Sequence, residues 1–254
     1  MPSFCYLDYA LSLSDDYPFV PIRPDSELGY PVTFSRLADF PDVLNAFWER
    51  VDLQQIWTQV KPDYLAEIQS YDLNHMARQL AFVWDYLRLE CKDRFTFVSI
   101  PNLLDTHGHA IGAHYENYYY AVESPGSHSH DFNVHEYLHS VVNALVNRNY
   151  KAYQSKLDVY FRAGKNTPIA KNYGSPAGYA AECLVRALDH RIAILITDNP
   201  ETADRRESIV KRRTQDGLLL TEPFYKLLAD FEQSDTNFEE FLPEMLDRLA
   251  EYRD

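Results

Sequence analysis

The sequence is poor in cysteine: its 254 residues include only three, Cys5, Cys91 and Cys183. They lie far apart without a Cys-x-x-Cys pair, which indicates neither a disulfide framework, a zinc ribbon nor a thioredoxin-like site. Long apolar runs are also lacking, and none approaches the roughly 18 residues of a membrane-spanning helix. No secretory signal follows Met1, so a cytoplasmic location is the default expectation. A secreted or periplasmic location is the alternative if Met1 does not begin the natural chain.

Basic side chains are in deficit, because 24 lysines and arginines stand against 38 aspartates and glutamates, for a formal net charge of −14. Nucleic-acid binders need a clustered basic surface, so we expect no nucleic-acid partner. The densest basic run, Arg205 to Arg213, contains Glu207 and has helical character. We interpret this run as a solvated helix face.

With 46% hydrophobic and 24% charged residues, the chain has the composition of a folded globular protein that can bury a sizeable core. Prolines crowd the aperiodic segment 1–33, which predicts a loop-rich lead-in. A helical lead-in is expected over 34–90, because apolar residues recur there at helical spacing. We expect helices from Phe34 to Val60, with Pro41 early in the second of them, and one long helix from Pro62 to Glu90.

A small sheet is expected over 94–124. Phe95–Ile100 is β-branched and aromatic, which predicts one strand, and the tyrosine-rich segment His114–Val122 predicts another. From Asp131 onward the chain has helical patterns, with a helical half over 150–254. Breaks are expected at Gly164, Pro168, Gly174, Pro200, Gly217 and Pro243. The predicted fold class is α+β, predominantly helical, with residues 34–254 as one domain.

One short segment carries a pattern with a specific chemistry. His135 and His139 lie four residues apart, and Glu136 follows the first histidine. On a helix this spacing places both imidazoles on one side, about 6 Å apart, where they can hold one zinc ion. Zinc activates water for attack on a carbonyl, and the adjoining glutamate can take the proton without being a ligand. This is the His-Glu-x-x-His arrangement of zincins, and two ordinary helix histidines are the alternative.

A zinc peptidase site needs a third protein ligand. Val142 and Leu145 stand where the metzincin pattern requires Gly and His, which excludes that class. The best candidate is Glu182, because its helix is otherwise apolar and a buried carboxylate is costly unless it pairs with a cation or a metal. A solvated stripe with one ion pair to Arg186 is the alternative for Glu182. Other candidate ligands are His190, Asp158, Glu116 and Glu123.

These features resemble the gluzincin zinc metallopeptidases, and more narrowly a group of gluzincin-like domains of unknown function. The resemblance implies a zincin-like fold whose small mixed sheet packs on an active-site helix at 131–148. It also implies that His135, His139 and Glu182 bind zinc and that Glu136 is the general base. Two features depart from thermolysin-like members: Arg186 replaces an aspartate that orients a ligand histidine, and an insertion at Asn147–Asn172 lengthens the path to Glu182.

Two further roles are open at this stage. The resemblance implies that an edge strand binds the substrate peptide by backbone pairing, and a plain sheet strand is the alternative. The residues of this strand are Tyr118, Tyr119, Tyr120, Ala121 and Val122. Tyr173 or Tyr179 can donate a hydrogen bond to a tetrahedral oxyanion, although core or surface tyrosines are commoner.

Four other histidines, His107, His109, His128 and His130, lie in or beside glycine- and serine-rich segments that are typical of loops. They lack a completing ligand, so we interpret them as loop histidines and treat an extra metal site as the alternative. The predicted function is a zinc-dependent metallopeptidase that acts on peptides or proteins. The alternatives are a zincin-fold binding or scaffolding domain without turnover and a helical interaction module without metal.

Overall fold

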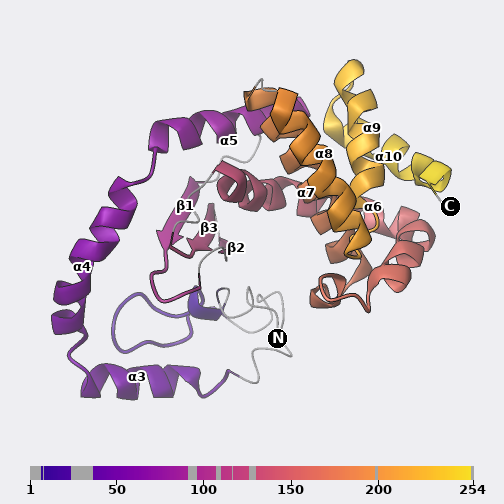
Figure 1. Ribbon diagram of the computed structural model, residues 1–254. Coiled ribbons are helices and arrows are strands. Elements are labelled where there is room, and N and C mark those ends of the chain that lie inside the picture. The colour runs from indigo at the N-terminus through magenta and orange to yellow at the C-terminus, as the bar shows by residue number, and fades with distance from the viewer. Residues whose placement is uncertain are drawn as a thin grey trace. The chain divides into compact units, whose positions relative to one another are not determined.

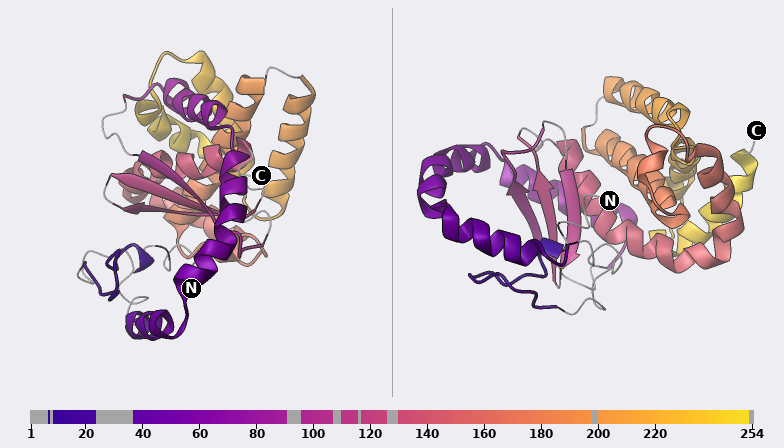
Figure 2. Two further views of the ribbon diagram at one scale, coloured as in Figure 1. Left: turned by 90° about the vertical axis from the view of Figure 1, so that its left-hand side faces the viewer. Right: turned by 90° about the horizontal axis from the view of Figure 1, so that it is seen from below.

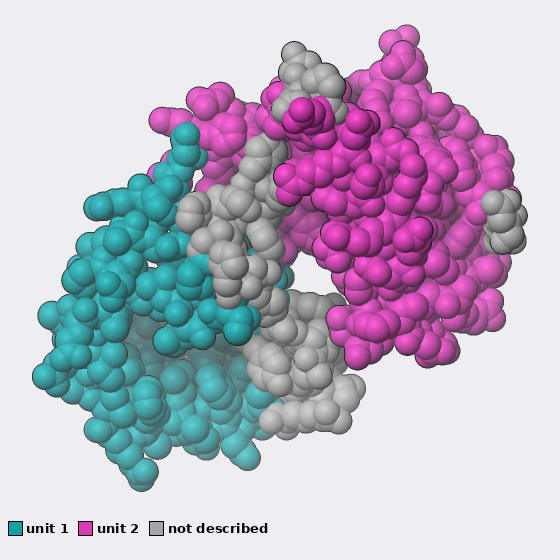
Figure 3. Space-filling model, viewed as in Figure 1, with its two compact units in different colours: residues 1–72, 93–129 teal, residues 73–92, 130–254 magenta. Residues whose placement is uncertain are grey.

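The computed structural model describes residues 7, 9–23, 37–90, 96–106, 110–115, 117–125, 130–197 and 200–252 (Figure 1). The chain forms two compact units, Met1–Asp72 with Asp93–Ser129, and Leu73–Lys92 with His130–Asp254 (Figure 3). The structure is predominantly helical with a small mixed sheet, which confirms the predicted α+β class. Among the described residues, no helix has the length and apolar character needed to cross a bilayer.

The first unit contains two of the lead-in helices, α3 (Phe40–Arg50) and α4 (Leu53–Gln69). Pro41 occupies the first turn of α3, as predicted. The prediction of one helix from Pro62 to Glu90 is wrong, because α4 contains Pro62 and ends at Gln69, and α5 (Leu73–Leu87) begins anew. The start of α4 is fixed instead by Asp52, whose side chain accepts a hydrogen bond of 2.9 Å from the Gln55 backbone N–H.

The sheet of the first unit has three strands, β1 (Thr96–Pro101), β2 (Ala110–Tyr115) and β3 (Tyr118–Glu123). Their order is β1-β3-β2 (Figure 1), with β1 parallel and β2 antiparallel to β3. Figure 2 shows the sheet from two further sides. The single strand predicted over His114–Val122 is wrong, because Tyr115 pairs with Tyr118 across a hairpin. Ile111 is the one β-branched residue of β2, and the alanines and glycine around it give the strand a weak sequence signal.

The second unit is helical. Besides α5 it contains α6 (His130–Gly164), α7 (Pro176–Thr197), α8 (Pro200–Gln215), α9 (Thr221–Gln233) and α10 (Phe238–Arg248), with short 3₁₀ turns at Ala170–Asn172 and Leu249–Tyr252. Helix α7 is the centre of this unit and lies against α6, α8 and α9. The C-terminal stretch contributes to the core of this unit through buried Phe224, Leu228, Phe231, Phe238 and Leu242.

Two helix boundaries in the second unit differ from the prediction. The helix predicted over 131–148 does not end near residue 148, because α6 continues to Gly164 through most of the expected insertion. Buried Leu157 and Tyr160 keep its far half packed, and the Tyr160 hydroxyl donates a 2.8 Å hydrogen bond to the Leu249 carbonyl. The break predicted at Pro243 is wrong, since this proline lies inside α10. Gly164, Pro200 and Gly217 lie at or beside helix ends, as predicted.

Candidate metal centre

The two histidines of the motif lie one turn apart on α6. Their rings have centroids 5.0 Å apart and meet edge to face at 82°. The helix forms here because apolar residues recur at four-residue spacing and are buried, as at Val134, Leu138 and Val142. The side chains of His135 and His139 are only 13% and 18% exposed, so both imidazoles are shielded but reachable from solvent.

The predicted third ligand comes from α7. Glu182 Oε2 lies 3.3 Å from His139 Nε2, and Glu182 Oε1 lies 3.8 Å from His135 Nε2. Ligand atoms of the three side chains all fall within 4.8 Å of one another, so this group can hold a metal ion. Small buried residues at Ala180 and Ala181 precede the glutamate and allow the close approach of α7 to α6 that the sequence predicts.

The charges of these three side chains influence one another's pKa values. Burial opposes charge on His139, but hydrogen bonding and attraction to Glu182 outweigh it and raise the pKa of His139 to about 9. Burial dominates at His135 and lowers its pKa well below the usual value. For Glu182, burial disfavours the carboxylate, yet Arg186 and the two histidines hold its pKa well below the usual value. The site therefore carries an ionised glutamate, one neutral histidine and one protonated histidine at neutral pH.

The predicted general base lies beside this group. Glu136 follows His135 on α6 and is buried, with 9% of its surface exposed. Its charge contributes to the raised pKa of His139, which indicates that the carboxylate is within electrostatic reach of the ligands. A buried carboxylate next to two imidazoles is the arrangement that proton transfer requires.

Two residues that the sequence analysis did not single out place an oxygen near the Nδ1 atom of each histidine. His139 Nδ1 lies 3.2 Å from Asn143 Oδ1, and His135 Nδ1 lies 3.9 Å from Asp189 Oδ2. Both rings thus turn Nε2 toward Glu182 and Nδ1 toward an oxygen, as metal-binding histidines do. The sequence signal that could have found Asn143 and Asp189 is their helical spacing. Asn143 lies one turn after His139, and Asp189 lies two turns after Glu182.

Arg186 contacts the third ligand directly, with its Nε 2.6 Å from Glu182 Oε1. The predicted i, i+4 ion pair is therefore present, but the solvated-stripe alternative is wrong for Glu182, whose side chain is only 5% exposed. The arginine stands where thermolysin-like members have the orienting aspartate, and Asp189 supplies a carboxylate near His135 from one turn farther along α7.

The two candidate tyrosines have different environments. The Tyr179 hydroxyl donates a 2.7 Å hydrogen bond to the Gly217 carbonyl and accepts one of 2.7 Å from the Leu219 N–H. Its ring is fully buried, so the prediction of an oxyanion role for Tyr179 is wrong. Tyr173 is half-buried, and burial together with the nearby charge of Glu182 raises its pKa. Tyr173 therefore lies near the metal ligands, whereas Tyr179 joins α7 to the turn before α9.

The strand proposed to bind substrate does not lie at an edge. Tyr118–Val122 belong to β3, whose backbone pairs with β1 on one side and β2 on the other. A central strand has no free backbone groups for an added peptide, so the predicted edge-strand role is wrong and the plain sheet strand is correct. Tyr119 and Ala121 alternate as buried residues with the more exposed Tyr118 and Tyr120, as in an ordinary sheet.

The other candidate ligands have different partners. Asp158 accepts a 2.7 Å hydrogen bond from the Tyr150 hydroxyl, and Glu123 accepts one of 2.8 Å from the Ser99 hydroxyl. His190 Nδ1 lies 3.4 Å from an Arg206 nitrogen. The remaining candidates, Glu116, His107, His109, His128 and the side chain of His130, lie outside the described residues.

The donor set fits zinc. Two imidazole nitrogens and one carboxylate oxygen are the ligands of catalytic zinc sites, which leave a fourth position open. Here the carboxylate is buried, and each histidine has an oxygen behind it, so the group is oriented as a ligand set. Comparison with protein-family models, with curated proteins and with solved structures yields no match to this chain.

Proposed function

We propose that this chain is a zinc-dependent metallopeptidase of the gluzincin type, with His135, His139 and Glu182 as the zinc ligands. The observation that carries the proposal is the convergence of these three side chains from two helices, with ligand atoms within 4.8 Å of one another. The His-Glu-x-x-His spacing and the downstream glutamate are the pattern that the gluzincin resemblance requires. The zincin-like fold of the chain stays part of this proposal.

Each residue of the site has a role in peptide hydrolysis. Zinc, when bound, would polarise the scissile carbonyl and make water more acidic. Glu136 then accepts a proton from the attacking water and returns it to the leaving amine. Tyr173 donates a hydrogen bond to the oxygen that gains negative charge, because its phenol stays protonated at neutral pH. The substrates are peptides or unfolded proteins.

The test compares cleavage by the full chain with cleavage by Glu136→Gln. With zinc and an unfolded protein substrate such as casein, we expect cleavage that a chelator abolishes and zinc restores. Glu136→Gln should bind zinc as the wild type does and lose cleavage by at least about a hundredfold. The control Glu207→Gln changes a half-exposed glutamate on α8 that pairs with Lys211, and it should retain activity. Full cleavage by Glu136→Gln would rule out the proposed role of this glutamate.

A second candidate function is a zincin-fold binding or scaffolding domain that holds a metal without turnover. The observation that favours it is the position of Arg186, whose guanidinium competes with a metal for Glu182 Oε1. Stoichiometric zinc in the purified protein, together with no cleavage of any unfolded substrate by the wild type, would select this function. Cleavage that depends on Glu136 would exclude it.

A further inference from the structure

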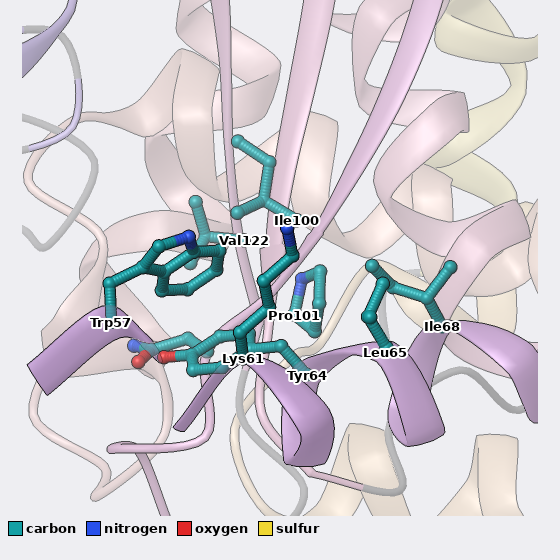
Figure 4. A pocket seen from close by; sticks show the side chains of 9 residues that line it. Trp57, Lys61, Tyr64, Leu65, Ile68, Ile100, Pro101 and Val122 are labelled. Atoms are coloured by element: carbon teal, nitrogen blue, oxygen red, sulfur yellow. The ribbon is translucent and has the colours of Figure 1, made fainter. Parts of the chain in front are cut away.

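Helix α4 in the first unit is amphipathic but has no buried residue along its 17 positions. Four of its large apolar side chains, Ile56, Trp57, Leu65 and Ile68, are between 42% and 45% exposed. Exposed apolar side chains scattered singly are normal, but a series of them along one helix marks a binding surface. Trp57, Leu65 and Ile68 face the sheet across a gap (Figure 4).

The gap is a groove of about 490 Å³ between α4 and one face of the sheet. Its floor includes Ile100 of β1 and Val122 of β3, which are paired in register and so project from the same face. Its walls are mainly the aromatic rings of Trp57 and Tyr64, whose centroids are 5.4 Å apart. Small-molecule sites typically have volumes of about 300 to 1,000 Å³ and walls that are mostly apolar, as here.

A second hollow of about 400 Å³ continues the groove toward the start of α4. It shares Trp57 and Tyr64 with the first and adds Leu53, Ile56, Val60 and Leu104. Leu104 is 92% exposed, so its side chain has almost no protein cover. The two hollows lie next to each other along α4 and share two lining residues, an arrangement suited to a single extended hydrocarbon chain.

The polar groups of the first hollow are hydrogen-bond donors. Lys61 extends from α4 toward the strands and lines the same hollow as Ile100 (Figure 4). Within the described part of the chain, Lys61 has no ion-pair partner. Asn102 uses Oδ1 to accept a 3.2 Å hydrogen bond from the Leu104 N–H, which leaves its amide N–H groups available. Hydrogen-bond donors and a positive charge beside an apolar floor favour a ligand with an anionic head group.

We propose that this groove binds a fatty-acid anion, with the carboxylate at Lys61 and Asn102 and the hydrocarbon chain between α4 and the sheet. The acidic Asp63 lines the second hollow and repels a carboxylate there, which fixes the direction of the ligand. The aliphatic tail therefore runs past Trp57 toward Leu104. This binding site is independent of the metal centre, which belongs to the other unit.

The test is a calorimetric titration of the full chain with dodecanoate below its micelle concentration. We expect saturable binding of one ligand with a negative heat-capacity change, the mark of buried apolar surface. Lys61→Met should weaken binding by about tenfold or more, because it removes a hydrogen bond to a charged group. The matched control Lys151→Met changes an exposed lysine of α6 and should bind dodecanoate as the wild type does. The wild type should bind dodecanol more weakly than dodecanoate, whereas Lys61→Met should bind the two ligands equally.

A second variant tests the position of the hydrocarbon chain. Ile56→Glu places a negative charge in the second hollow, where the tail would lie, at a side chain that is 44% exposed, so the fold tolerates it. We expect this variant to lose dodecanoate binding while circular dichroism stays that of the wild type. The proposal is overturned if the wild type does not bind dodecanoate, if Lys61→Met binds it as tightly as the wild type, or if Ile56→Glu binds it unchanged.

Discussion

Glu182 Oε2 lies 3.3 Å from His139 Nε2, so a carboxylate of α7 and an imidazole of α6 face each other at a buried position. Without a metal, the positive charge that a buried carboxylate needs comes from protonated His139 and from Arg186. A bound metal would supply that charge instead of the histidine proton. The site is therefore a charge network that a proton or a metal can complete, and four predictions follow from its contacts and from the packing around it.

Metal binding should compete with one proton. His139 has a pKa of about 9 in the metal-free protein and must be neutral to bind zinc, whereas His135 and Glu182 have lowered pKa values and are already deprotonated at neutral pH. Zinc affinity should therefore rise with pH up to about 9, by about tenfold per pH unit between pH 6 and 8. Calorimetry in two buffers of different ionisation enthalpy should find about one proton released per zinc near pH 6.5. An affinity that is constant with pH would contradict this protonation state.

Asp189 should act as a positioning residue for His135. Asp189→Asn keeps the size of the side chain but removes the negative charge 3.9 Å from His135 Nδ1. We expect zinc affinity to fall by about 10- to 100-fold, as is typical when an outer partner of a ligand histidine is lost. Competition with a fluorescent zinc chelator measures this change. The control is Asp204→Asn, at an exposed position of α8, and it should bind zinc as the wild type does.

Arg186 should stabilise the metal-free protein. In Arg186→Met the buried Glu182 loses the guanidinium that lies 2.6 Å from Oε1. Removing one partner of a buried pair typically costs about 3 to 5 kcal/mol, and we expect the lower end because the arginine is 24% exposed. Urea unfolding in the presence of a chelator measures the loss, and zinc should reduce it.

An exposed arginine provides the control for this prediction. Arg205→Met changes an exposed arginine of α8 and should leave the unfolding free energy within about 0.5 kcal/mol of the wild type. A metal-free Arg186→Met as stable as the wild type would show that Glu182 does not depend on this arginine.

Gly217 should be irreplaceable in the turn between α8 and α9. Its φ of 111° is in the region that favours glycine, and a Cβ there would overlap Thr167. Its carbonyl also accepts the hydrogen bond of Tyr179. Gly217→Ala should lower the free energy of unfolding by about 2 kcal/mol or more. Gly174→Ala is the matched control, because a Cβ at Gly174 meets nothing within 4 Å, and an equal effect of the two substitutions would refute the argument.

The group of candidate metal ligands was predictable because most of the sequence features that position it are local. The four-residue spacing of His135 and His139 sets their geometry as soon as a helix forms, whatever the rest of the chain does. Glu182 was identified from a different signal, an acidic residue in an apolar helix, and its burial confirms that reasoning. Its distance from His139 depends on how α7 packs on α6, which small residues before Glu182 indicated but could not fix.

The errors came from features that local patterns do not determine. Strand β2 has weak β-propensity and exists because β3 provides a partner, so the tyrosine-rich segment alone could not reveal a hairpin. Pro62 resembled a helix start but lies inside α4, where the capping Asp52 sets the true beginning. The central position of β3 depends on the order of strands, and the use of the Tyr179 hydroxyl depends on a turn at Gly217.

The most direct test of the central claim is anomalous X-ray scattering at the zinc edge from crystals of the full chain grown with zinc. We expect one peak in the second unit, bonded to His135 Nε2, His139 Nε2 and a Glu182 oxygen at about 2.0 to 2.2 Å. A zinc peak that lacks any of these three side chains, or no peak at this position in zinc-saturated crystals, would contradict it.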